Sequence, residues 1–146
     1  MNSRFTAENP AGDTPDNAQV LSSLRNLKEF LYSFNFLKMH AEKSFVISGV
    51  PPGTYCRGMS EPGKQYVLYH HHSRLDESGM YYIVNPGHYL ENMVLYLPGG
   101  TYKADWVDPA SGKVINSVTF THQGGNKDLT APEHAVDIAL RIKRVR

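Results

Sequence analysis

Residues 92–122 read NMVLYLPGGTYKADWVDPASGKVINSVTFTH, and this stretch decides the fold. Three runs in it, at 92–97, 101–107 and 113–121, are rich in β-branched and aromatic residues, which favour strands. Pro-Gly-Gly and Asp-Pro-Ala-Ser-Gly separate the runs and are typical of tight turns. No helical pattern lies between them, which argues against a parallel sheet.

The same pattern continues outward in both directions. Further strands are expected at 44–48, 55–59, 65–71, 80–84 and 137–143, with a loop at 123–127. Alternation along 65–71 places Tyr66, Leu68 and His70 on one face. Alternation along 137–143 points Ile138, Leu140 and Ile142 inward. We predict an all-β domain over residues 36–146, an antiparallel β-sandwich that is jelly-roll-like.

Residues 14–35 carry the one clear helical pattern. Thr14 suits the N-cap and Pro15 the first helical position. Apolar residues recur at spacings of four and three and form a stripe of Val20, Leu24, Leu27, Leu31 and Phe34. An isolated helix of this length is marginal in water, so we expect the stripe to pack on the sandwich. Uncovered apolar surface would promote a homodimer through the helix. Residues 1–13 are polar and predict a disordered arm.

Length, charge and cysteine content exclude several classes of protein. The chain has 146 residues, which suits one domain, and its formal net charge of +1 is too small to attract nucleic acid or a membrane surface. Cys56 is the only cysteine, so neither an intrachain disulfide nor a cysteine-based zinc site can form. We expect Cys56 to be a buried apolar side chain. No signal peptide is recognisable at the N-terminus.

No residue stands in a recognisable catalytic motif. Glycoside hydrolysis needs paired carboxylates, whereas the acidic residues here are scattered among turns, where they usually cap or stay solvated. No serine has a Gly-x-Ser-x-Gly setting, and no glycine-rich turn precedes a helix as a phosphate loop does. We therefore expect neither enzyme activity nor a cofactor.

The run His70-His71-His72 is the candidate for a metal site. Alternate residues of a strand share a face, so only His70 and His72 could bind one ion. Side chains that could supply a third ligand are His88, Asp76 and Glu77. The alternative is a polar strand end that runs into a loop, and on that interpretation no metal is bound.

Aromatic side chains in the middle of the chain are candidates for ligand contact. Such rings stack on sugar faces, but they are also common in sandwich cores. Trp106 is the largest apolar side chain, and we expect it in the core. The candidates for weak sugar stacking are Tyr81, Tyr82 and Tyr102.

Four segments resemble, in the right order, the C-terminal module of a group of bacterial glycoside hydrolases. The run LRNLKEFLYSFNFLKM at 24–39 is similar to the segment that closes their catalytic barrel, and EPGKQYVLY at 61–69 is similar to one of their strands. LPGGTY, WVDP and Ser-Gly within 97–112 resemble a hairpin, and Thr-Ala-Pro at 130–132 resembles the start of the end segment. The resemblance spans about residues 20–143, with Asn35 and the histidine run as departures.

This module is known as a collagen-binding domain, and the resemblance implies a β-sandwich packed against a (β/α)8 barrel. The catalytic acids of such enzymes lie on the barrel, so none carries over to this sequence. The resemblance implies a non-catalytic accessory domain that stabilises or orients a glycoside hydrolase barrel. The alternative is a binding module for polysaccharide or collagen that uses surface aromatics. Related full-length enzymes are typically secreted or periplasmic.

Overall fold

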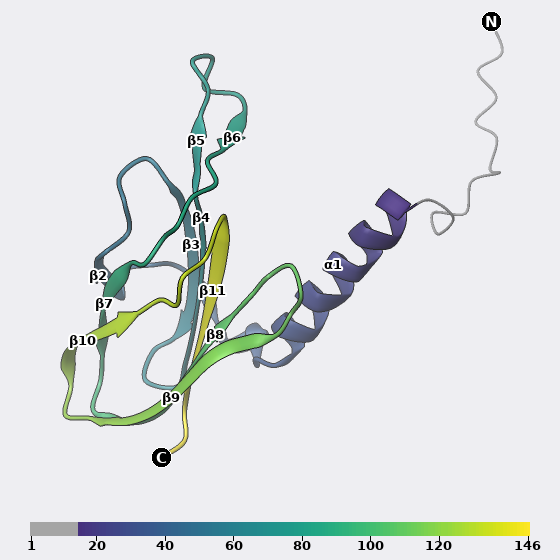
Figure 1. The fold of residues 1–146 in the computed structure, drawn as a ribbon. Helices are drawn as coiled ribbons and strands as arrows, with labels where there is room; N and C mark the ends of the chain where they lie inside the picture. The colour runs from purple at the N-terminus through teal and green to yellow at the C-terminus, as the bar shows by residue number, and fades with distance from the viewer. Residues whose placement is uncertain (1–14) are drawn as a thin grey trace, which may run out of the picture.

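The computed structural model describes residues 15–146, and they form a two-layered β-sandwich with one helix (Figure 1). The all-β sandwich predicted from the sequence is confirmed. A six-stranded sheet faces a three-stranded sheet, and a two-stranded arm projects from one end of the sandwich. The arm expected at residues 1–13 and the cap expected at Thr14 lie outside the described residues.

All neighbouring strands within the sheets are antiparallel. The large sheet has the order β1 (His40–Ala41), β3 (Tyr55–Glu61), β4 (Gln65–His71), β11 (Asp137–Arg144), β8 (Gly100–Val107) and β9 (Val114–His122). The small sheet has the order β10 (Gly125–Thr130), β7 (Asn92–Leu97) and β2 (Val46–Ser48). The arm pairs β5 (Ser73–Leu75) with β6 (Tyr82–Val84).

The prediction of a loop at 123–127 is wrong, because the chain from Gly125 onward is strand β10. This strand pairs with β7 over its whole length, from Gly125 opposite Leu97 to Thr130 opposite Asn92. It forms the edge of the small sheet, and Leu129 is its only buried residue. An edge strand needs just one apolar anchor on its inner face, so its polar sequence carries no alternating pattern. The short strands β1 and β5 were also not expected from the sequence.

The core lies between the two sheets and follows the strand alternation. On β7, Met93, Leu95 and Leu97 are completely buried. On the facing sheet, Leu140 of β11 lies opposite Leu68 on one side and Trp106 on the other, and all three are buried. Burying one such side chain stabilises the fold by about 1.5–3 kcal/mol. The predicted burial of Trp106, Cys56 and the inward face of 137–143 is confirmed.

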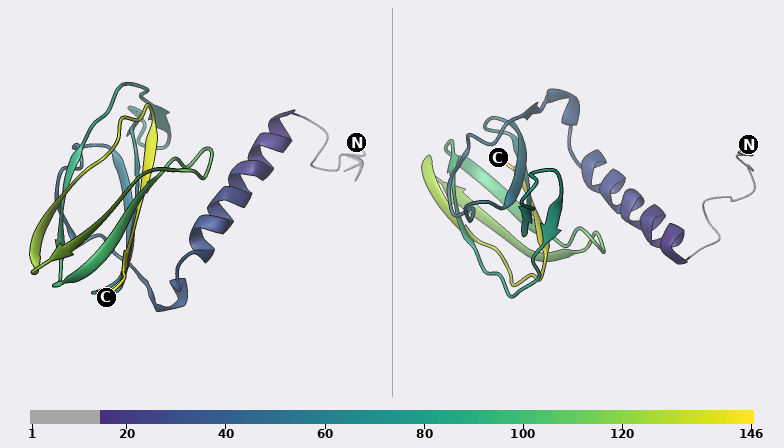
Figure 2. Two further views of the ribbon diagram at one scale, coloured as in Figure 1. Left: turned by 60° about the horizontal axis from the view of Figure 1, so that its bottom comes forward. Right: turned by 90° about the horizontal axis from the view of Figure 1, so that it is seen from above.

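Helix α1 (Pro15–Tyr32) and the short 3-10 helix η1 (Phe36–Lys38) lie outside the sandwich. Figure 2 shows that α1 runs away from the sheets and approaches them with its C-terminal end. Phe34, just beyond α1, is buried with Met39 and Val67 on the outer face of the large sheet. Asn26 also donates a hydrogen bond to the Ala110 carbonyl in the β8–β9 turn, at 2.9 Å.

The expectation that the stripe of α1 packs on the sandwich is wrong for Val20, Leu24 and Leu27 and right for Phe34. Leu27 is 53% exposed, and Val20 and Leu24 are exposed to a similar extent. The reason is geometric: α1 leaves the sheet at an angle, so contact with the sheet is confined to its last turns. No helix among residues 15–146 is long and apolar enough to cross a membrane.

Candidate functional site

The structure separates the three tyrosines that the sequence proposed for sugar stacking. Tyr81 and Tyr82 lie on the β5–β6 arm and are 66% and 51% exposed. Tyr102 is completely buried, and its hydroxyl donates a hydrogen bond to the Pro98 carbonyl at 2.8 Å. Its ring packs beside Phe120. Tyr102 is therefore a core residue, and its prediction as a ligand-binding residue is wrong.

The rings at the base of the arm form a packed cluster. The rings of Tyr82 and Tyr55 meet edge to face, with centroids 5.4 Å apart and planes inclined by 87°. Tyr55 meets Tyr69 in the same manner at 6.2 Å and 70°, and the Arg57 guanidinium lies over the Tyr55 ring. Edge-to-face contacts stabilise aromatic clusters. Rings inclined so steeply do not form the flat row on which an extended sugar chain could stack.

An apolar cleft of about 220 Å³ lies between α1 and the outer face of the large sheet. Apolar side chains from both sides line it, including Leu27 and Leu31 from α1 and Met59 and Val67 from the sheet. We call the junction surface the exposed helix stripe together with this cleft, that is Val20, Leu24, Leu27, Leu31, Met59 and Val67. Large exposed apolar patches on a folded protein often mark interaction sites.

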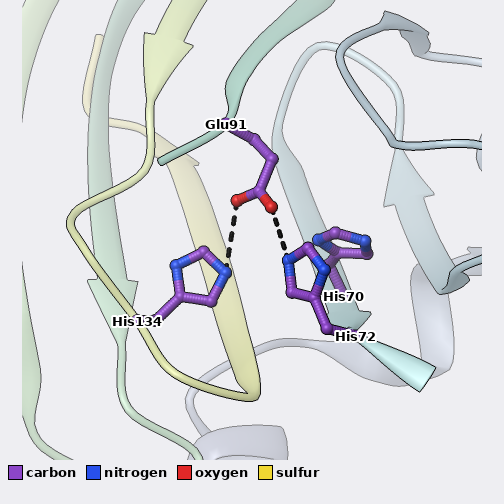
Figure 3. Close-up of side chains that lie close together, drawn as sticks. All are labelled: His70, His72, Glu91 and His134. Carbon is purple, nitrogen blue, oxygen red and sulfur yellow. Dashed lines mark ion pairs between the residues drawn. The ribbon is translucent and has the colours of Figure 1, made fainter. Parts of the chain in front are cut away.

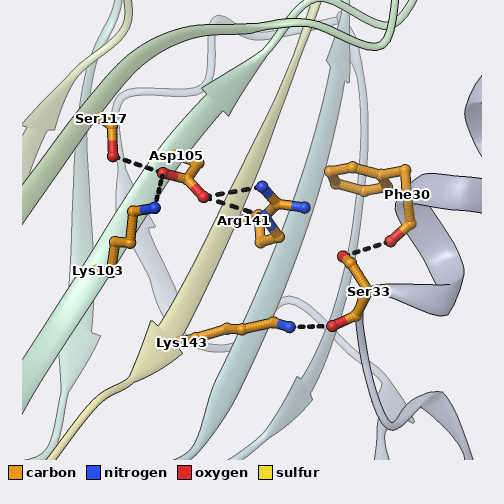
Figure 4. A network of polar contacts seen from close by, with 7 residues as sticks. All are labelled: Phe30, Ser33, Lys103, Asp105, Ser117, Arg141 and Lys143. Atoms are coloured by element: carbon orange, nitrogen blue, oxygen red, sulfur yellow. Dashed lines mark hydrogen bonds and ion pairs between the residues drawn. The ribbon is translucent and has the colours of Figure 1, made fainter.

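A buried ion pair stiffens the sheet beside this cleft (Figure 4). Arg141 of β11 donates hydrogen bonds to the Asp105 carboxylate of β8 from Nη2 at 2.8 Å and from Nε at 3.2 Å. Ser117 of β9 donates to the other carboxylate oxygen at 2.6 Å. Burial by itself would raise the pKa of Asp105, but the hydrogen bonds from Ser117 and Arg141 and the charge of Arg141 outweigh it and hold that pKa below its usual value. Asp105 is thus a charged residue that ties three strands together.

The same strand positions the C-terminal end of the helix. Lys143 of β11 donates a hydrogen bond to the Ser33 carbonyl (Figure 4). Its ammonium lies 5.4 Å from the Phe34 ring centroid. The Arg141 guanidinium lies 5.9 Å from the Phe30 ring centroid. Cations over aromatic faces are attracted by the ring quadrupole. These contacts hold the last turns of α1, whereas the N-terminal part of the helix stays exposed.

A second site lies at the opposite end of strand β4, where three histidines and a glutamate converge (Figure 3). His70 ends the buried face of β4, His72 follows the strand, Glu91 precedes β7 and His134 precedes β11. One nitrogen or oxygen from each residue lies within 4.8 Å of the others. All four residues are buried, with exposed fractions of 0%, 3%, 8% and 8%.

This arrangement agrees with the sequence in part. His70 and His72 are brought together, as the strand alternation predicts. The structure does not place His88, Asp76 or Glu77 among the candidate ligands. His88 is exposed and pairs with Glu133 at 2.6 Å, and the Asp76 carboxylate accepts hydrogen bonds within the arm turn. Glu91 and His134 take that place, and neither stands in a motif that would have identified it.

The local chemistry keeps two of the imidazoles neutral. Burial lowers the pKa of His70 to about 4. Burial also lowers the pKa of His72, against the opposing effect of the Glu91 carboxylate. A neutral imidazole has a free lone pair on one ring nitrogen, which is the form that binds a metal ion. The cluster could therefore hold a cation.

Comparison with known proteins bears on the fold. No family model matches this chain, and no curated protein matches it. A solved structure described as a glycoside hydrolase is similar with a TM-score of 0.60 and 15% sequence identity. The match covers 99% of this chain and 29% of that chain, so the present chain spans less than a third of the length of that protein. Helix and sandwich together thus have the fold of one part of a glycoside hydrolase.

Proposed function

We propose that this chain is a non-catalytic accessory domain that packs against a glycoside hydrolase catalytic barrel through the junction surface. The observation that carries the proposal is the fold match, which includes the helix and the sandwich and leaves most of the other glycoside hydrolase chain outside it. On this proposal the helix and the sandwich form one domain of a larger assembly that includes the catalytic barrel. The junction surface is the apolar face on which that barrel would be expected to dock.

The helix supports this proposal through its energetics. Val20, Leu24 and Leu27 expose more than half of their surface to water. Covering each with a partner would stabilise the assembly by roughly 1 kcal/mol, since about half of a full side-chain burial remains available. An isolated helix also gains most of its stability from packing of its apolar face. A barrel packed on the stripe would bury these side chains and stabilise the helix.

The acidic residues support the non-catalytic part of the proposal. Hydrolysis of a glycosidic bond uses two carboxyl groups that face each other across the substrate. Within residues 17–146, the buried carboxylates are Glu91 and Asp105. Glu91 faces two histidines, and Asp105 is bound by Arg141 and Ser117. Neither is among the residues that line the apolar cleft beside α1.

The docking proposal is tested with the double substitution Leu24→Glu/Leu27→Glu. We expect it to weaken binding to a separately produced glycoside hydrolase (β/α)8 barrel at least tenfold, because two charges would have to be desolvated at the interface. The free chain should keep its unfolding midpoint, since both positions are exposed. Binding would be measured by calorimetry and stability by urea unfolding.

Val118→Glu on β9 is the matched control, because Val118 is an exposed apolar residue away from the junction surface. It should leave barrel binding unchanged. The isolated chain should not hydrolyse aryl-glycosides. Equal losses from the control and the double variant would contradict docking through α1, and turnover that disappears on replacing a single Asp or Glu would contradict the non-catalytic assignment.

A second candidate function is weak carbohydrate binding by the arm, favoured by the exposure of Tyr81 and Tyr82. Each stacked ring would contribute on the order of 1 kcal/mol, so two rings give millimolar affinity at best. Titration with soluble polysaccharide, followed by NMR, should show binding that is lost in Tyr81→Ala/Tyr82→Ala. Sub-micromolar binding that survives this substitution would show that another surface is responsible.

A further inference from the structure

We propose that His70, His72, Glu91 and His134 bind one zinc ion, which ties three separate segments of the sandwich together. The site goes beyond the proposed docking function and does not depend on it. Among the described residues, five buried side-chain nitrogen and oxygen atoms lack a conventional hydrogen-bond partner, and four of them belong to this cluster. Three of the four face one another, because the Nε2 atoms of His72 and His134 both lie against the Glu91 carboxylate. Buried polar atoms are almost always paired, so the cluster calls for a partner that its atoms share.

The hydrogen bonds around His134 fix the position of its proton. Its Nδ1 lies 2.9 Å from the Pro132 carbonyl oxygen, which can only accept, so Nδ1 carries the hydrogen. In the neutral ring, the lone pair is then on Nε2. That atom lies 3.2 Å from the Glu91 carboxylate. Two lone-pair-bearing atoms therefore face each other at close range, which becomes favourable when both bind one cation or when a second proton is placed on His134.

His70 is held in the same ligand-ready state by Thr54. The Thr54 hydroxyl lies 2.7 Å from the Pro51 carbonyl and donates its hydrogen there. It must then accept from His70 Nε2, which lies 2.8 Å away. The lone pair of His70 is consequently on Nδ1, a buried atom with no donor near it. Outer partners that fix the tautomer in this way are typical of metal-ligating histidines.

A network of hydrogen bonds without a metal ion would leave one buried acceptor of the cluster unpaired. A doubly protonated His134 could donate to Glu91, but the lone pair on His70 would still have no partner. An unpaired buried acceptor costs about 1–3 kcal/mol. A single cation satisfies His70, His134 and Glu91 at once. His72 faces the same carboxylate through Nε2, and its ring is fixed by stacking on Tyr89 with centroids 3.3 Å apart and planes inclined by 2°.

The ligand set identifies the metal and its role. Three imidazole nitrogens and one carboxylate oxygen make four ligands, the number that zinc binds tetrahedrally in structural sites. All four residues are buried, so no side of the ion would be open to substrate or water. The ligands come from the end of β4, from the segment before β7 and from the segment before β11. The backbone of Tyr89 pairs with that of His134, which brings the last two segments together without the ion.

The full chain, purified without a polyhistidine tag, tests the site directly. Mass spectrometry of the metal content should give one zinc per chain after zinc loading and dialysis. Zinc added back to chelator-treated protein should raise the unfolding midpoint by about 10 °C, as saturating binding of a tight ligand does for a domain of this size. Cobalt loading should give the intense visible bands of a tetrahedral site. A zinc content below about 0.2 per chain, the background of such measurements, together with no zinc-dependent shift would overturn the proposal.

Variants locate the site. His134→Gln and Glu91→Gln should each lose the bound zinc and the zinc-dependent shift. His88→Gln is the matched control, because His88 is an exposed histidine that pairs with Glu133 outside the cluster. It should retain both. Retention of zinc by His134→Gln, or equal loss in His88→Gln, would place the ion elsewhere. If a ligand variant does not fold, the measurements on the unsubstituted chain still decide the question.

Discussion

Gly49→Ala should destabilise the sandwich by about 3 kcal/mol, the sum of a backbone cost near 1 kcal/mol and a steric cost of about 2 kcal/mol. Gly49 follows β2 and has a φ of +97°, a conformation that L-residues rarely adopt. An added Cβ would also lie 2.1 Å from the Asn92 carbonyl oxygen and 2.7 Å from the Met93 Cα. Both contacts are with backbone, so the pairing of β2 with β7 would have to open.

Gly53→Ala separates these two contributions. Gly53 also has a positive φ, of +76°, but no atom lies within 4 Å of a Cβ added there. Its substitution should therefore cost only about 1 kcal/mol, from the backbone alone. Urea unfolding of the two variants gives the difference. Equal costs would mean that the close approach of Gly49 to β7 is not a constraint on the fold.

Asp105→Asn should cost about 2 kcal/mol at pH 7, because it leaves the Arg141 guanidinium without its charged partner. The value lies below the range for a completely buried pair, since the side chain of Arg141 is 21% exposed. Asparagine keeps the size of the side chain, so the loss reports the charge and the hydrogen bonds. Asp128→Asn on the edge strand is the control, because Asp128 is exposed, and it should change stability by no more than about 0.5 kcal/mol.

The effect of Asp105→Asn should depend on pH in one direction. The folded pKa of Asp105 lies below its usual value. The carboxylate therefore stabilises the fold fully above the unfolded pKa of about 3.9, and this contribution is lost as the pH falls through the folded pKa. Urea unfolding at pH 7 and near pH 3 should show the difference between the original chain and Asp105→Asn shrinking at the lower pH. A constant difference would mean that the ionised state of Asp105 contributes nothing.

Local patterns predicted much of the secondary structure and several buried faces. Alternation along 137–143 placed Leu140 inward, and alternation along 65–71 placed Leu68 on one face with Tyr66 and His70, because successive side chains of a strand point to opposite faces whatever the strand pairs with. The spacing of four and three predicted the helix for an equally local reason. Tyr102 shows the limit of this approach. Its run was predicted as a strand, but which face of that strand met the core depended on pairing with β9 and β11.

The helix stripe and the histidine cluster depended on tertiary structure in different ways. Periodicity identified the apolar face of α1, but whether that face is covered depends on the angle at which the helix leaves the sheet. Alternation put His70 and His72 on one face, yet Glu91 and His134 reach them only because β7 and β11 return to the same end of the sandwich. By itself the sequence determined an all-β sandwich with one amphipathic helix, since these follow from short-range backbone geometry. The tertiary structure alone decided which distant side chains meet, because those contacts are set by strand pairing between segments far apart in the chain.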